Sequence, residues 1–167
     1  AEVSKGSIYL YFDSKEEIYT QILISANIDR HKEWNVFAKQ GGTASEALIA
    51  FAHEYVSYFL DNNELFRILM TFMLQAENMN LTDEQNTQLI HTTNENVHVI
   101  AEILQRGVDS GEFISGMDVR RMQYAVWGLL NGVISLYIYT GVPERRGERI
   151  FTIVHDSLNV LLKGIKS

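Results

Sequence analysis

A single proline, Pro143, interrupts this 167-residue chain, which also contains no cysteine. Proline breaks helix interiors, so its near absence permits long uninterrupted helices. Apolar residues recur at helical spacing, and the sequence shows no strand alternation, repeat or low-complexity segment. With 46% hydrophobic residues, the chain can bury one globular core. These features predict an all-α protein without disulfides or cysteine-based metal sites.

Capping signals predict where the helices begin and end. Ser14, Thr43 and Thr82 each stand three residues before a Glu or Gln, the spacing of a capping box, and Asp118 is a further N-cap. Gly41, Gly42, Gly111 and Gly141 are the expected stops. The predicted long helices cover residues 15–40, 44–61, 64–77, 83–109 and 119–140, and one from near Pro143 to about 164.

The segment before Ser14 predicts a short helix with an unusual outward face. Ser4 can cap it, and Ile8 and Phe12, four residues apart, share the face that packs inward. Small and aromatic residues then occupy the opposite face. An ordinary amphipathic helical hairpin with incidental tyrosines is the alternative explanation.

The stretch VSKGSIYLYF at residues 3–12, followed by SKEEI at 14–18, resembles the signature of TetR-family transcriptional repressors. The resemblance implies that residues 1–14 are the C-terminal part of a helix-turn-helix domain, containing its recognition helix. Residues 15–167 would then form a helical ligand-binding and dimerisation domain. Weaker similarities to the TetR regulatory domain follow at residues 107–113 and 127–132.

The resemblance also implies which residues meet DNA in the major groove. They are Lys5, Gly6, Ser7, Tyr9, Leu10 and Tyr11, with Lys15 on a phosphate. The family has two helices before this motif, so roughly 35–45 residues of DNA-binding domain are expected to be missing from this chain. As given, the chain is expected to bind DNA poorly. Its net charge of −7 also argues against nonspecific nucleic-acid binding, so the DNA prediction depends on the motif.

The family's regulatory core holds a pocket for a small, often apolar effector between its middle helices, and this sequence offers suitable residues. Apolar walls with a few polar groups are typical of such sites, although an aromatic stripe is more often simple core. The predicted ligand contacts are Tyr55, Phe59, Phe66, Met70, Met73, Asn94, Trp127 and Asn131.

Two features predict a homodimer. Gly128 and Gly132 have a G-x-x-x-G spacing that permits close helix packing. The last helix carries an apolar stripe that includes Phe151, Val154, Leu158 and Leu162, and the family pairs its last two helices with those of a second subunit. The alternative is that this stripe belongs to the core of one subunit.

Membrane, metal and catalytic interpretations are weaker. The uncharged run 124–142 is long enough to span a membrane, but it contains Asn131, Ser135 and two central glycines. His91, Glu95, His98 and Glu102 share one helical face, yet no second half of a di-metal motif exists, so a solvated polar stripe is favoured. No motif places a catalytic nucleophile.

The sequence therefore predicts a cytoplasmic, TetR-type helical repressor that is not an enzyme and needs no cofactor. Its expected partners are a near-palindromic operator DNA, a small apolar effector that releases it, and a second copy of itself. The alternatives are a helical small-molecule-binding module without a DNA role and, more remotely, a helical enzyme.

Overall fold

The computed structural model describes residues 12, 14–75, 81–139 and 147–167. Six helices lie within these ranges: α2 (Lys15–Lys39), α3 (Ala44–Asp61), α4 (Asn63–Gln75), α5 (Asp83–Asp109), α6 (Val119–Tyr139) and α7 (Gly147–Ile165). The one β-type contact between described residues is an isolated bridge from Phe113 to Lys166. The all-α prediction is confirmed, while the predicted recognition helix and the segment around Pro143 lie outside the described residues.

The predicted caps set the helix boundaries. Thr43 and Thr82 both form complete capping boxes, in which the threonine side chain and the residue three positions later exchange hydrogen bonds with each other's backbone. Ser14 Oγ accepts a hydrogen bond from Glu17 N at 3.0 Å, and Asp118 Oδ1 accepts one from Arg121 N at 3.0 Å. Beyond the helix ends, Gly42 and Gly111 adopt φ values of 95° and 75°, a conformation that favours glycine.

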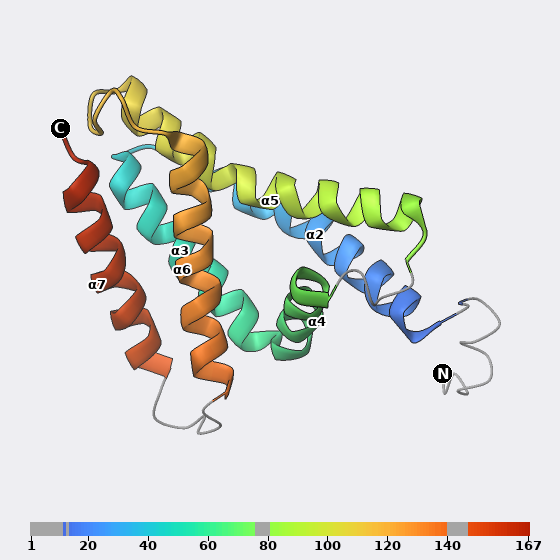
Figure 1. Cartoon of the computed structure of the whole chain (residues 1–167). Coiled ribbons are helices and arrows are strands. Elements are labelled where there is room, and N and C mark those ends of the chain that lie inside the picture. The colour runs from blue at the N-terminus through green and yellow to red at the C-terminus, as the bar shows by residue number, and fades with distance from the viewer. Residues whose placement is uncertain (1–11, 13, 76–80, 140–146) are drawn as a thin grey trace.

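Two pairs of helices give the subunit its shape (Figure 1). The long helices α2 and α5 lie side by side and run parallel, while α6 and α7 form an antiparallel pair at the other end. Three hydrogen bonds keep a nearly constant offset between α2 and α5: Gln85 to Glu17, Asn96 to Asn27, and Arg106 to Ala38. Helix α3 contacts each of the other five described helices, so it forms the centre of the described fold.

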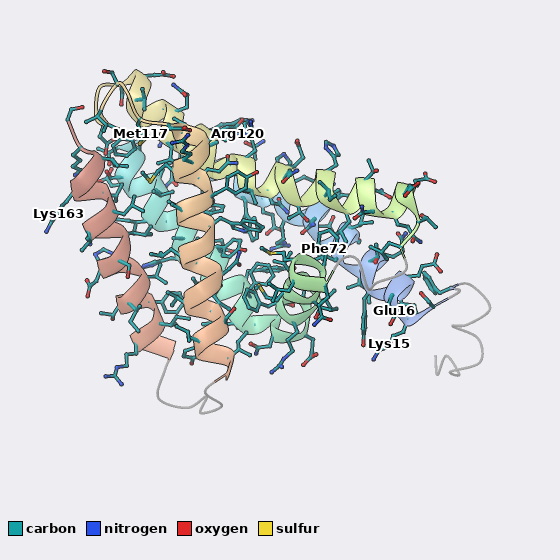
Figure 2. The ribbon with its side chains drawn as sticks, viewed as in Figure 1. Lys15, Glu16, Phe72, Met117, Arg120 and Lys163 are labelled. Carbon is teal, nitrogen blue, oxygen red and sulfur yellow. The ribbon has the colours of Figure 1, made fainter. Side chains whose placement is uncertain are left out.

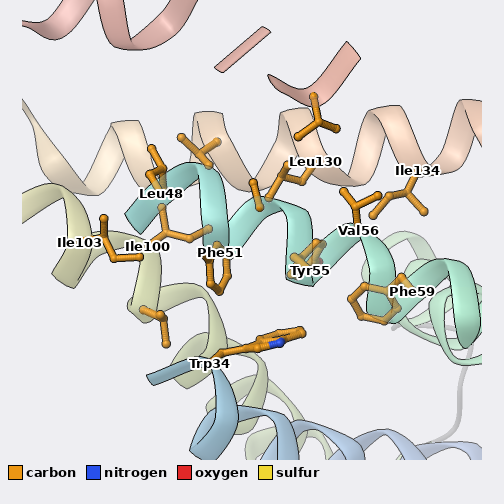
Figure 3. Packing of buried hydrophobic residues seen from close by; sticks show 14 of the residues in the cluster. Trp34, Leu48, Phe51, Tyr55, Val56, Phe59, Ile100, Ile103, Leu130 and Ile134 are labelled. Atoms are coloured by element: carbon orange, nitrogen blue, oxygen red, sulfur yellow. The ribbon is translucent and has the colours of Figure 1, made fainter. Parts of the chain in front are cut away.

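The core fills the space around α3 (Figure 3). Leu48, Phe51 and Val56 of α3 are fully buried, and Ile100 of α5 and Leu130 of α6 meet them from either side. Phe51, Tyr55 and Phe59 continue into an aromatic cluster with Trp34 of α2, whose ring centroid lies 5.1 Å from that of Tyr55. This burial of large apolar side chains is the main source of stability.

The predicted dimerisation stripe on the last helix requires a correction. Val154 and Leu158 are 0% exposed and Leu162 is 2% exposed within a single subunit. Their side chains belong to the core because α7 packs its apolar face against α3 and α6. They are therefore not available to a second subunit, whereas Phe151 is only half-buried.

Among the described segments, no helix is long and apolar enough to cross a membrane.

Candidate functional site

A small internal cavity lies where α2, α3, α4, α5 and α6 converge. Its volume is about 10 Å³, roughly that of one water molecule. Aromatic and aliphatic side chains form most of its wall, together with three polar residues of α2 and α5. The lining residues are Asn27, Trp34, Phe51, Tyr55, Phe59, Leu69, Thr93, Asn96, Val97, Ile100 and Trp127.

On the α3–α6 side, the wall is held by a chain of hydrogen bonds. Trp127 Nε1 donates to the Tyr55 hydroxyl at 3.0 Å, and that hydroxyl donates to Asn131 Oδ1 at 2.8 Å. Burial raises the pKa of Tyr55 well above its usual range, so its hydroxyl stays neutral and keeps the proton that it donates. These two hydrogen bonds hold the ring of Tyr55 in place at the cavity wall.

On the α2–α5 side, a second polar cluster joins the two long helices. Asn27 Nδ2 donates to Thr93 Oγ1 at 3.0 Å, and Asn96 Nδ2 donates to the carbonyl oxygen of Asn27 at 3.1 Å. All three residues are less than 10% exposed. The site predicted from the sequence did not include Trp34, Asn27, Thr93 and Asn96. A signal was present, because Asn96 lies four residues before Ile100 and eight before Leu104, on a buried face of α5.

Three buried polar atoms in and beside the cavity lack a hydrogen-bond partner among the described residues. They are Trp34 Nε1, Asn96 Oδ1 and Asn131 Nδ2. Trp34 and Asn96 line the cavity directly, and Asn131 is bonded to Tyr55, which also lines it. Buried polar atoms usually find a partner, so these three atoms are candidates for contact with a bound group.

The structure brings only part of the predicted ligand-contact set to this cavity. Tyr55, Phe59 and Trp127 line it, and Asn131 stands behind Tyr55. The remaining predicted residues lie outside the lining. Phe66 packs on Phe59 from behind with ring centroids 5.3 Å apart, Met70 is half-buried against the core, Met73 is 39% exposed and Asn94 is exposed. Asn94 borders a groove on the outer side of α5, and Asn96, two positions later, faces the cavity instead.

The predicted DNA contacts Lys5, Gly6, Ser7, Tyr9, Leu10 and Tyr11 all lie outside the described residues. Lys15 is exposed at the first residue of α2, and its Nζ lies 5.1 Å from the ring centroid of Tyr19. Figure 2 shows Lys15 and Glu16 together at one end of the subunit, with Lys163 near the opposite end. Lys15 is thus far from the α6–α7 pair.

The two predicted interface glycines are exposed on α6. Gly128 and Gly132 lie between Tyr124, which is 46% exposed, and Leu136, which is 69% exposed. The four residues recur every fourth position and form a stripe on the helix surface. Ile153 and Val160 of the neighbouring α7 are 47% and 72% exposed. We call these six residues the α6–α7 stripe.

The polar stripe of α5 carries no metal cluster. His91, Glu95, His98 and Glu102 are all exposed, and Glu95 Oε2 lies 3.9 Å from His31 Nε2 of α2. The described part of the chain has no group of three or more side chains placed to hold a metal ion.

Known proteins match the chain both in sequence and in fold. A family model described as the tetracyclin repressor-like C-terminal domain matches residues 41–144. The fatty acid metabolism regulator protein of Bacillus subtilis (strain 168) is 28% identical over 168 residues, which cover 99% of this chain and 80% of the relative.

Solved structures share the fold. The transcriptional regulator FadR from Bacillus subtilis, in complex with stearoyl-CoA, superposes with a TM-score of 0.75 at 22% identity, covering 98% of this chain and 83% of that one. The TetR family transcriptional regulator PfmR from Thermus thermophilus gives 0.75 at 23% identity, covering 99% and 84%. The family model spans more than half of the chain. This chain belongs to the TetR family of ligand-responsive, DNA-binding transcriptional repressors.

Proposed function

We propose that this regulator releases its operator when a long-chain acyl-CoA thioester binds between α2, α3, α4, α5 and α6. The observation that carries the proposal is the aromatic-walled cavity at this convergence, in a chain related to a fatty acid metabolism regulator. A fold relative was solved in complex with stearoyl-CoA, which supports the same ligand class. The walls are apolar enough to receive a hydrocarbon chain.

The small volume of the cavity means that binding of an acyl chain would require the surrounding helices to move. About 10 Å³ cannot hold an acyl chain, so the surrounding helices must separate to admit one. Helix α2 lines the cavity through Asn27 and Trp34 and begins at Lys15, directly after the segment assigned to DNA binding. A ligand that favours the separated arrangement therefore biases the position of that segment. An operator affinity change of about 100-fold needs only about 2.7 kcal/mol of differential binding.

We assign residues 1–14 to the helix-turn-helix domain and residues 15–167 to the effector-binding and dimerisation domain. Lys5, Gly6, Ser7, Tyr9, Leu10 and Tyr11 would contact the operator, and Lys15 would contact a phosphate. The regulator would act in the cytoplasm, where its DNA is found, and would carry out no catalytic step.

The dimer would form through the α6–α7 stripe. Exposed Leu136 and Val160 supply apolar area, and Gly128 and Gly132 let a partner helix approach the backbone. This assignment replaces Val154, Leu158 and Leu162, which are buried in their own subunit. A dimer would place two recognition helices in successive major grooves about 34–36 Å apart.

The test is operator binding by the full-length protein, measured as fluorescence anisotropy of a labelled DNA fragment from its own promoter. Stearoyl-CoA should weaken operator binding by at least about tenfold, while free CoA and stearate should not. A double Tyr9→Ala, Tyr11→Ala variant should lose the operator but retain stearoyl-CoA. Unchanged operator affinity at a stearoyl-CoA concentration shown by calorimetry to saturate the protein would overturn the proposal.

A further inference from the structure

The hydrogen bonds around the cavity fix the orientation of both buried amides. Asn96 Nδ2 is used by the carbonyl oxygen of Asn27, so Oδ1 is the atom left as an acceptor. Trp127 Nε1 donates to the Tyr55 hydroxyl, whose own proton must then go to Asn131 Oδ1. Asn131 Nδ2 is left as a donor. Rotating the Asn96 amide would place two acceptors against each other, and rotating the Asn131 amide would take away the acceptor of the Tyr55 hydroxyl proton.

Trp34 contributes the second donor. Its side chain is 2% exposed, and its Nε1 finds no acceptor anywhere in the described parts of the chain. The indole packs against Tyr55 and lies beneath Phe51 in Figure 3, so it is held in place by the aromatic cluster. The indole nitrogen is a donor only and cannot adapt to a donor on a ligand.

The cavity region thus offers two donors, Trp34 Nε1 and Asn131 Nδ2, and one acceptor, Asn96 Oδ1. A hydroxyl group has the opposite set, one donor and two acceptor lone pairs. A carbonyl oxygen would leave Asn96 Oδ1 unmatched, and a methylene would leave all three atoms unmatched. None of the described lining residues carries a charge, so neither a carboxylate nor an amine is favoured there.

Unpaired buried polar atoms destabilise a fold, so the two that line the cavity, Trp34 Nε1 and Asn96 Oδ1, are explained if a polar ligand group completes them.

We infer that the core cavity is a recognition site for an uncharged hydroxyl group, and that the preferred effector is a hydroxylated long-chain acyl-CoA. This inference rests on the proposed function, because the acyl-CoA class comes from there. The hydroxyl distinguishes the preferred ligand from an acyl-CoA whose chain has no hydroxyl, such as stearoyl-CoA.

The test compares stearoyl-CoA with a panel of hydroxystearoyl-CoA isomers, each bearing one hydroxyl at a different carbon of the chain. Binding to the full-length dimer is measured by isothermal titration calorimetry. At least one isomer should bind about tenfold more tightly than stearoyl-CoA, because its hydroxyl completes the cavity hydrogen bonds.

Two variants each remove one of the cavity atoms that would form a hydrogen bond with the ligand hydroxyl. Trp34→Phe deletes one donor and Asn96→Leu deletes the acceptor, so each should reduce the preference for the hydroxylated chain to about threefold or less. Phe66→Leu is the control, because Phe66 packs on Phe59 outside the cavity lining and carries no polar side-chain atom, so the preference should be unchanged.

The outcomes separate this inference from the proposed function. If stearoyl-CoA binds and no hydroxylated isomer binds more tightly, the inference is overturned and the proposed function stands. A preference that persists in both Trp34→Phe and Asn96→Leu also overturns it. If no acyl-CoA binds at all, both fail. The wild-type comparison decides the matter even if one variant does not fold.

Discussion

Two polar regions of this subunit differ in how completely their hydrogen bonds are paired. At the junction of α3, α5 and α7, the Glu112 carboxylate accepts hydrogen bonds from the backbone N–H groups of Ala44, at 2.6 Å, and Ser45, at 3.0 Å, and from the Ser45 hydroxyl. At the cavity, Trp34 Nε1 and Asn96 Oδ1 have no partner among the described residues. Both regions join helices that are distant in the sequence, but the cavity retains unpaired polar atoms, whereas the Glu112 carboxylate accepts hydrogen bonds at both of its oxygens.

This difference in hydrogen-bond pairing distinguishes polar residues that stabilise the fold from polar residues that are candidates for ligand binding. Glu112 caps the N-terminus of α3, where an anion also meets the positive end of the helix dipole. Its own backbone carbonyl accepts a hydrogen bond from Ser167 N at 3.1 Å, so the same residue ties down the end of the chain after α7. Such a complete network stabilises the fold, whereas the unpaired atoms at the cavity are the ones that the proposed ligand hydroxyl would complete.

The largest effect is expected from breaking the junction itself. In Gly107→Ala, the added Cβ would overlap the ring of Phe113, which is 1% exposed and cannot move outward. Overpacking of this kind should lower the free energy of unfolding by about 2–3 kcal/mol, measured by urea denaturation. Gly164→Ala is the control, because its Cβ would meet no neighbour and should be neutral or stabilising. Equal losses in both variants would contradict the packing argument.

A smaller effect is expected when the charge of the junction is removed. Glu112→Gln keeps the shape but weakens the charge-assisted hydrogen bonds, which should cost about 1–2 kcal/mol near neutral pH. Partial burial alone would raise the pKa of Glu112, but the hydrogen bonds from Ser45 and Ala44 and the nearby Lys166 lower it overall.

The pH dependence of this variant follows from that lowered pKa. The contribution of Glu112 is complete above the unfolded-state value of about 4.5 and is lost as the pH falls through the lower folded-state pKa. The stability difference between wild type and Glu112→Gln, from urea midpoints, should therefore shrink in acid. A difference independent of pH would show that the carboxylate charge is irrelevant.

A smaller loss of stability is expected when the hydrogen bonds on the α3–α6 side of the cavity wall are removed. Tyr55→Phe removes the hydroxyl that joins Trp127 to Asn131, leaving both without that partner, and should cost about 1 kcal/mol in urea denaturation. Tyr58→Phe is the matched control on the same helix, because Tyr58 packs edge-on against Trp34 without belonging to that hydrogen-bond chain. Should Tyr58→Phe prove the more costly change, the importance of the chain would be refuted.

The smallest effect is expected at His53, where an unpaired atom can instead gain a proton. Burial and the neighbouring His155 lower the pKa of His53, whose Nε2 has no partner among the described residues. Its contribution to stability is present above the unfolded-state value of 6.5 and is lost as the pH falls through the lower folded-state pKa. His53→Gln should therefore reduce the loss of stability on acidification to about pH 5.5 by about 0.5 kcal/mol or less, read from urea midpoints. His155→Gln should give part of this change, and an unaltered pH profile in His53→Gln would exclude the effect.

Local signals allowed most of the fold to be predicted. Helix boundaries followed from Ser14, Thr43, Thr82 and Asp118, because a cap is a contact within one turn and is visible in the sequence. The family was predicted from the stretch around Val3–Phe12 and is confirmed by the family model.

Contacts between distant segments were harder to predict. An apolar stripe such as Val154, Leu158 and Leu162 looks the same whether it meets its own core or a partner subunit, so the sequence could not decide between them. The role of Glu112 as a cap of α3 joins residues 67 or 68 positions apart, beyond the reach of any local pattern. Asn96 was overlooked because polar residues are normally assigned to the surface.

The constant offset between α2 and α5 has a mechanical consequence. Arg106 binds the last carbonyl groups of α2, the Asn27–Asn96 hydrogen bond joins the middle, and Gln85 reaches Glu17 near the start. Two helices that are joined by hydrogen bonds at three points resist sliding past each other, so α2 and α5 are expected to move as one rigid unit. If this unit rotates by a small angle about the end near Arg106, the displacement increases along α2 and is largest at Lys15.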